Sequence, residues 1–306
     1  MKKNISCILF VIAAMIWGFA FSAQKQIEEV PAFTVGAVRN IFATLFLFLL
    51  IPLLDKATGN GRIVFSKKKP LDFTKYELIG GAVCGCVLTA ASAFQQFGIG
   101  EGTDAGKAAF ITALYVVLVP VLNLLLRKRS PINVWISVGI AVVGFYLLCI
   151  KDDFSLVFSD ALILICALIF ALHIISIDRF SPHSDGVRMS CIQFFVAFLL
   201  NLVLALIFDS PIDLAQVGEG ILPLLYLGIG SSGVAYTLQI VGQKHVNPAV
   251  ASVILSLESV FGVVGGAIFL GERMSIKEYI GCAIVFVAVI LSQLDFSKKK
   301  ADIPDK

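Results

Sequence analysis

Charge is scarce in this chain: only 15% of its 306 residues are Asp, Glu, Lys or Arg, whereas 58% are hydrophobic. Soluble domains typically carry about 25% charged and about 45–50% apolar residues. A soluble fold would lack the polar surface that it needs, so the composition points to a chain embedded in lipid. The net charge of +3 is small and the cations are scattered over the segments between apolar runs, which argues against nucleic-acid binding.

Motifs of several enzyme and pump classes are also absent. The sequence has no GxxxxGK[ST] phosphate loop, HExxH helix or GxSxG elbow, so it offers no basis for ATP-driven transport or standard hydrolysis. The seven cysteines lie in or at the start of apolar runs, where Cys is commonly a small hydrophobe; Cys84-Gly85-Cys86 as a soft-metal pair is the weaker interpretation. We therefore expect no enzymatic activity, no cofactor and no metal.

Ten apolar runs make up most of the chain. A membrane-spanning helix needs about 20 mostly apolar residues, so the sequence predicts an all-α integral membrane protein of about ten transmembrane helices. Lys2 and Lys3 before the first run also resemble the start of a signal peptide, but that run is long for one and is better interpreted as a span. The runs are 5–23, 33–53, 77–99, 104–126, 132–150, 156–177, 189–208, 221–241, 248–270 and 279–294.

Lys and Arg are distributed unevenly between the two sides that ten spans define. Cations near span ends are retained on the cytoplasmic side, and eighteen of the 24 Lys and Arg fall on the side of the termini. The other side has only Lys25, Lys107, Lys151, Arg273 and Lys277. We therefore expect a multi-pass protein of the cell membrane, with both termini and the basic 55–75 loop in the cytoplasm.

The two halves of the chain are weakly similar at an offset near 144 residues. Five spans per half is an odd number, so the second copy must enter the membrane inverted, as in carriers with a central site. We expect a first five-helix repeat at 1–150, a second, inverted one at 151–296 and a basic cytoplasmic tail at 297–306. The aligned pairs are Gln95 with Gln239, Gly98 with Gly242 and Trp135 with Tyr279.

Several short segments, taken in order, resemble the EamA family of the drug/metabolite transporter superfamily over nearly the full chain. The resemblance implies a ten-helix metabolite permease, often an exporter of amino acids or related solutes. Ser259, and Phe170-Ala171 in the sixth span, depart from the family pattern and leave the substrate open. The matching segments are Ile16-Trp17-Gly18, Pro31 with Arg39, 105–110 leading to Pro120, 226–230, Ser256-Leu257-Glu258 and Gly271-Glu272-Arg273.

Ionisable residues inside spans are the first site candidates, because a charge near the bilayer centre is costly unless it faces protein or water. Glu258 lies near the middle of its span and could bind a cation or a proton, or hold a kinked helix. Arg39 could attract a carboxylate with its planar guanidinium, or serve helix pairing and topology. His173 could relay protons or be a structural hydrogen-bonding residue.

Uncharged polar and aromatic residues complete the candidate substrate site. Trp17, Tyr115, Tyr236, Gln95 and Gln239 suit a cavity for zwitterionic or aromatic solutes, although helix packing explains each of them as well. The Gln95–Gln239 correspondence favours a position at the repeat interface.

The sequence thus predicts a permease that moves small metabolites by alternating access, and the resemblance implies that it exports them. Its expected partners are a small-molecule substrate, protons as a candidate coupling ion, and the lipid bilayer, with a monomer or a homodimer as the assembly and no nucleic acid. The rival interpretations are a membrane-embedded lipid-modifying enzyme, which would need clustered ionisable residues at one headgroup layer, and a non-transporting receptor or scaffold.

Overall fold

The computed structural model describes residues 3–27, 29–58, 72–101, 105–128, 130–149, 157–271 and 273–294, and within these ranges regular structure is helical throughout. Most of the 55–75 loop and the whole 297–306 tail lie outside the described residues. The elements are α1 (Lys3–Lys25), α2 (Ala32–Thr58), α3 (Lys75–Gly100), α4 (Ala105–Ala113), α5 (Tyr115–Leu125), α6 (Ile132–Cys149), α7 (Phe158–Phe180), η1 (Ser181–His183), α8 (Gly186–Phe208), α9 (Leu214–Glu219), α10 (Ile221–Leu225), η2 (Tyr226–Ala235), α11 (Tyr236–Gln243), α12 (Pro248–Leu255), α13 (Glu258–Phe269) and α14 (Ile276–Gln293).

The predicted spans are confirmed as helices. Among the described residues, eight helical stretches are long and apolar enough to cross a membrane, and two shorter apolar ones, Phe110–Leu125 and Ile132–Leu148, bring the number to about ten. Three spans are not uniform α-helices: the fourth is α4 with α5, the eighth is α10 with η2 and α11, and the ninth is α12 with α13. The short helix α9 was not expected from the sequence; Asp213 caps it by accepting from the backbone N–H of Ala215 at 2.8 Å.

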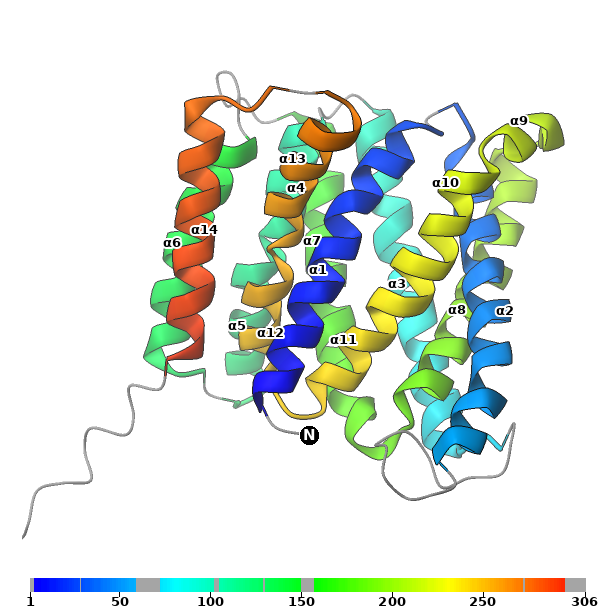
Figure 1. Ribbon diagram of the computed structural model, residues 1–306, viewed down its shortest axis with the longest axis horizontal. Helices are drawn as coiled ribbons and strands as arrows, with labels where there is room; N and C mark the ends of the chain where they lie inside the picture. The colour runs from blue at the N-terminus through cyan, green and yellow to red at the C-terminus, as the bar shows by residue number, and fades with distance from the viewer. Residues whose placement is uncertain are drawn as a thin grey trace, which may run out of the picture.

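Successive spans run in opposite directions, and α1 begins at the same end of the bundle at which α14 ends (Figure 1). The five spans that start with α1 are therefore oriented opposite to the five that start with α7. Helix packing also relates the two repeats. The second spans of the repeats, α2 and α8, pack on each other, as do the fifth spans, α6 and α14. The third span of one repeat packs on the first span of the other, α3 on α7 and η2–α11 on α1. The fold consists of two inverted five-helix repeats.

The repeats interleave into two groups of helices. The six-helix group consists of spans that pack on one another: α1, α2, α3, α7, α8 and the α10–η2–α11 span (Figure 1). The four-helix group consists of the other four spans: α4 with α5, α6, α12 with α13, and α14. Each group takes corresponding spans from both repeats. They meet chiefly where α1 contacts α12 and α13, and where α7 contacts α4 and α5.

Both broken spans of the four-helix group are interrupted near mid-span. At the first break the backbone N–H of Leu114 donates to the Ile111 carbonyl at 3.1 Å. At the second break the backbone N–H of Leu257 donates to the Ile254 carbonyl at 3.1 Å. These are tighter, three-residue hydrogen bonds than those of an α-helix. The hydroxyl of Ser256 also donates to the Val253 carbonyl at 2.7 Å, and such back-bonding bends helices. The break places Glu258 at the start of α13.

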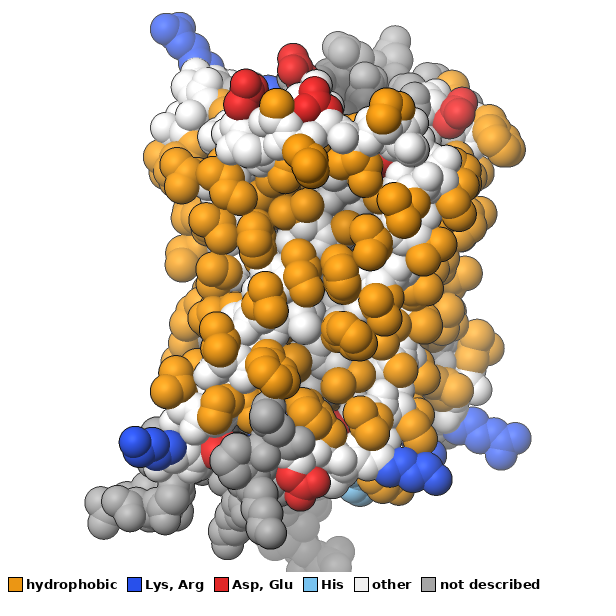
Figure 2. Space-filling view, turned by 90° about the vertical axis from the view of Figure 1, so that its right-hand side faces the viewer, with side chains coloured by type: hydrophobic (Ala, Val, Ile, Leu, Met, Phe, Trp, Pro, Cys, Tyr) orange, Lys and Arg blue, Asp and Glu red, His pale blue; other side chains and the backbone are white. Residues whose placement is uncertain are grey.

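A hydrophobic belt covers the face of the bundle seen in Figure 2, and charges gather above and below it. The end at which α1 begins is called the basic end and the opposite one the acidic end. At the basic end lie the described cations Lys3, Lys56, Lys75, Arg127, Lys128, Arg179, Arg188 and Lys244. Charged residues at the acidic end include Lys25, Glu29, Glu101, Asp209, Asp213, Glu219, Arg273 and Lys277.

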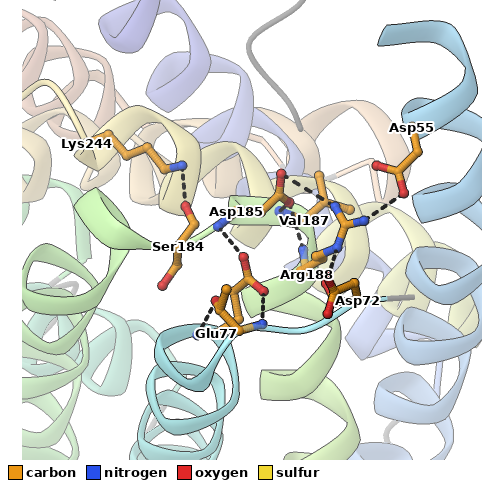
Figure 3. A network of polar contacts seen from close by, with 9 residues as sticks. Asp55, Asp72, Glu77, Ser184, Asp185, Val187, Arg188 and Lys244 are labelled. Atoms are coloured by element: carbon orange, nitrogen blue, oxygen red, sulfur yellow. Dashed lines mark hydrogen bonds and ion pairs between the residues drawn. The ribbon is translucent and has the colours of Figure 1, made fainter. Parts of the chain in front are cut away.

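A buried polar network joins α2, α3 and α8 at the basic end (Figure 3). Arg188, 1% exposed as a residue, donates from its side chain to the Asp55 carboxylate at 2.6 Å and to the Asp72 carbonyl at 3.0 Å. Asp185 caps α8 by accepting from the backbone N–H of Arg188, and its own backbone N–H donates to the Glu77 carboxylate at 3.0 Å. Since breaking a buried ion pair leaves an uncompensated charge, this network holds the three helices in register.

Lys244 extends the same network to the end of α11, where its ammonium donates to the Ser184 carbonyl (Figure 3). Burial raises the pKa of the Asp185 carboxyl and outweighs the opposing attraction of Arg188. Burial likewise lowers the pKa of Lys244, against the attraction of Asp185 and Glu77.

At the acidic end the α2–α8 pair is joined by fewer contacts. The Asp209 carboxylate accepts from the Thr34 backbone N–H at 2.7 Å and from the Thr34 hydroxyl at 3.0 Å.

Candidate functional site

Arg39 lies in the eighth position of α2, well inside its span, and faces the η2 segment of the inverted repeat. Its Nε donates to the Ser232 hydroxyl at 3.0 Å and its Nη2 to the Ser231 hydroxyl at 3.0 Å. Arg39 is partly exposed as a residue. Arg39 forms no ion pair with a described residue, so its positive charge is uncompensated within the described protein.

Aromatic rings of α1 and α7 pack on Tyr236, the first residue of α11. Trp17 lies 4.6 Å from Tyr236 between ring centroids, and its indole N–H donates to the Ser231 carbonyl at 3.0 Å. His173 lies 5.8 Å from Tyr236, edge to face, and its Nε2 is 3.1 Å from the Gln193 amide oxygen. Tyr236 thus lies at the centre of the aromatic cluster of the six-helix group.

Glu258 is contributed by the four-helix group. Its carboxylate accepts a hydrogen bond of 3.2 Å from the Tyr115 hydroxyl, so the first residues of α5 and α13 meet just after the two breaks. Glu258 is partly exposed, whereas Tyr115 is 5% exposed. The Tyr236 hydroxyl is within electrostatic range of both Arg39 and Glu258. Opposite charges from the two helix groups therefore lie around one aromatic cluster.

Of the eight residues proposed from the sequence, the structure brings six into this central cluster: Trp17, Arg39, Tyr115, His173, Tyr236 and Glu258. Gln95 lies apart from it, because its amide donates to the Thr112 hydroxyl at 3.1 Å between α3 and α4. Gln239 lies one turn beyond Tyr236, is 2% exposed, and its amide oxygen has no partner among the described residues. The inverted-repeat correspondence thus does not place both glutamines in the cluster.

Ser231 and Ser232 did not stand out in the sequence, yet they are 2% and 1% exposed and bind Arg39 directly. They lie in η2, a π-helical segment of sequence YLGIGSSGVA. π-Helical turns are rare and occur frequently at functional sites. A pair of hydroxyl residues after two glycines in an apolar span is the signal that could have identified this segment.

A separate surface groove of about 350 Å³ opens at the basic end. None of the eight candidate residues lines it. Two lysines lie in its wall, Lys128 paired with Asp178 at 2.7 Å and Lys244 bound to the Ser184 carbonyl. It is a feature of the surface and not of the central cluster.

Inverted repeats with charged and aromatic residues between them are the architecture of membrane transporters. The chain belongs to the EamA-like transporter family, whose family model matches residues 4–150 and again residues 157–294. It is a multi-pass membrane transporter.

Relatives over nearly the whole length carry the same general description. An uncharacterized transporter of Archaeoglobus fulgidus is 30% identical over 295 residues, covering 96% of this chain and 87% of that protein. The uncharacterized transporter YwfM of Bacillus subtilis is 26% identical over 310 residues, covering 98% and 97%. A solved crystal structure has the same fold, with a TM-score of 0.76, 16% identity and coverage of 95% of this chain and 98% of that one.

Proposed function

We propose that this transporter carries small zwitterionic metabolites, amino acids or closely related polar solutes, outward across the cell membrane by alternating access. The observation that carries the proposal is the pair Arg39 and Glu258. Each is a charged residue inside a span, each has only uncharged hydrogen-bonding partners in the described chain, and each is partly exposed.

A zwitterion would compensate both charges at once. An unpaired charge in a spanning segment costs several kcal/mol unless it meets water or a counter-charge. A substrate carboxylate would bind the Arg39 guanidinium, and its ammonium would bind the Glu258 carboxylate. Trp17 and Tyr236 would supply apolar surface for the side chain of the solute. The other cluster members, Tyr115 and His173, would orient Glu258 and Tyr236.

Alternating access is supported by an asymmetry between the two ends of the four-helix group. On the basic-end side of the breaks α5 packs against α12, whereas their counterparts on the acidic-end side, α4 and α13, have no comparable packing among the described residues. Val119 of α5 and Val250 and Val253 of α12 belong to one buried cluster. In an inverted repeat the opposite arrangement would be the second state, and this asymmetry supports a cycle in which one state is closed toward the basic end.

Orientation, domain division and assembly complete the proposal. The basic end is the cytoplasmic one, because cations are retained on that side, which makes both termini cytoplasmic. The repeats span 1–150 and 151–296, and the tail at 297–306 follows. The unit of transport is a single chain, alone or in a homodimer, since the central cluster is formed by residues of one chain.

Flux through liposomes containing the purified chain tests this function. The solutes are the common amino acids, each with its amide, which lacks the carboxylate, and its deaminated acid, which lacks the ammonium. We expect exchange of at least one zwitterion and about tenfold slower exchange of both analogues, since a charge-assisted hydrogen bond contributes about 1.5–3 kcal/mol. Repeating the assay with a pH gradient identifies or excludes proton coupling.

Two substitutions remove one recognition element each. Arg39→Lys keeps the charge but loses the planar fork, and Glu258→Gln keeps a partner for Tyr115 but loses the charge. Both should slow exchange about tenfold or more without changing insertion or thermal stability. Ser137→Ala, which removes a buried hydroxyl bonded within α6, is the matched control. Exchange of no solute, or exchange insensitive to both substitutions, contradicts the proposal.

A further inference from the structure

One edge of the Arg39 guanidinium is hydrogen-bonded to serines, and the other edge has no hydrogen bond to a described residue. Arginine has five N–H donors in a rigid plane. The Nε–H and one Nη2–H are engaged by Ser232 and Ser231. The remaining three N–H groups, two on Nη1 and one on Nη2, have no protein partner among the described residues. Nη1, which has no partner among the described residues, is not among the fully buried polar atoms, so this end of the guanidinium keeps some accessible surface.

The serine pair is held in place by contacts on both sides of η2. The Ser231 carbonyl accepts from the Trp17 indole N–H, and the Tyr226 hydroxyl donates to the Ile16 carbonyl at 2.8 Å, which fixes η2 against α1. Gly228 lies directly against Phe42 and the Arg39 carbonyl, where a Cβ would not fit. Close approach of η2 to α2 therefore brings both hydroxyls to the side edge of the guanidinium.

We propose that Ser231 and Ser232 are positioning residues that select the substrate's anionic group. By occupying the Nε–Nη2 edge, they fix Arg39 so that only its Nη1–Nη2 edge can meet a ligand. Two parallel N–H groups on that edge match the two oxygens of a carboxylate. The preferred ligand group is a free carboxylate, and a neutral amide in its place can accept only one of the two bonds. This inference rests on the proposed function and specifies how the same site selects its substrate.

The test uses the two tryptophans of the chain, Trp17 and Trp135. In a Trp135→Phe background, Trp17 is the sole tryptophan and reports on the site. Fluorescence titrations compare leucine, alanine and acetate with leucinamide, alaninamide and acetamide. In this background we expect the carboxylates to bind about tenfold tighter than the amides, corresponding to about 1.4 kcal/mol.

Replacement of both serines by alanine frees the guanidinium to rotate. Ser231→Ala with Ser232→Ala should reduce the carboxylate-to-amide ratio at least about fivefold while amide binding changes little. A purely structural role would weaken acids and amides equally and leave the ratio unchanged. If the double variant does not fold, each single variant, which leaves one of the two hydrogen bonds, should show a smaller fall in the same ratio. Ser137→Ala is again the control and should keep the full ratio.

The outcomes separate the two proposals. A high ratio in the Trp135→Phe background that persists in the serine variants overturns the positioning role and leaves the proposed function intact. No preference for carboxylates in that background overturns recognition by Arg39 and, with it, the zwitterion site. A ratio that falls only in the serine variants supports both.

Discussion

At the scale of single residues, Arg188 and Asp55 form an ion pair whose side chains are 2% and 6% exposed. We expect Arg188→Ala to lower the free energy of unfolding by about 3–5 kcal/mol, because it leaves the Asp55 carboxylate buried without its cation. Replacing both, Arg188→Met with Asp55→Leu, should recover much of that loss. Thermal unfolding in detergent measures the difference.

Lys128 and Asp178 provide the matched exposed pair, with side-chain exposures of 54% and 17%. Lys128→Ala should change the free energy of unfolding by less than about 1 kcal/mol, as is typical of surface pairs. Equal effects of the Arg188 and Lys128 substitutions would show that the buried network does not stabilise the basic end.

Asp185 gives a prediction for the pH dependence of stability. Burial raises the pKa of its carboxyl above the ordinary value of 3.8, so near that pH the folded state binds more protons at this site than the unfolded state. Stability contributed by this group is therefore greatest below 3.8 and falls as the pH rises through the folded-state pKa.

Asparagine keeps the helix-capping oxygen and removes the titration. The melting temperature of the unchanged protein should fall as the pH rises from about pH 4 to about pH 7, and in Asp185→Asn this fall should be smaller. An identical pH profile in both proteins would mean that Asp185 titrates in the folded state as it does in the unfolded chain.

At the scale of helices, apolar run length predicted where spans begin and end but not how they are built. The run 132–150 became α6 (Ile132–Cys149) with almost unchanged bounds. The run 248–270 is broken at Ser256 and Leu257, which hydropathy cannot show because the break depends on serine back-bonding and on contacts with Tyr115 from the other repeat. The π-helical segment η2 packs against α1 and α2, and run length does not reveal these contacts.

The charged part of the candidate site was predictable from the sequence, because ionisable residues are rare inside membrane spans. Arg39 and Glu258 stood out because ionisable residues inside spans demand partners. Ser231 and Ser232 did not, since hydroxyls are tolerated almost anywhere in a helix and only the fold brings them to Arg39. Gln95 and Gln239 were paired by sequence offset, but the offset carries no information on which direction each side chain faces.

At the scale of the whole molecule, the two repeats do not act as two separate halves. The six-helix group supplies Trp17, Arg39, His173 and Tyr236, while the four-helix group supplies Tyr115 and Glu258. A solute bound between Arg39 and Glu258 therefore bridges the two groups. Binding can bias their relative position, since a ligand shifts an equilibrium by its differential affinity for the two states.

The central claim, one site reached alternately from both ends, is tested most directly by labelling single cysteines during exchange. In a background without the native cysteines, Val119→Cys replaces a buried residue of α5 in the cluster that also contains Val250 and Val253 of α12. Val263→Cys lies at the matching position of α13 by the repeat offset. An impermeant maleimide is added to oriented vesicles, with and without the fastest-exchanging amino acid. We predict that labelling of the Val119→Cys variant from the basic end is negligible at rest and accelerates during exchange, while labelling of the Val263→Cys variant from the acidic end slows. A labelling rate of the Val119→Cys variant that is unchanged by a solute that the protein demonstrably exchanges would contradict the account.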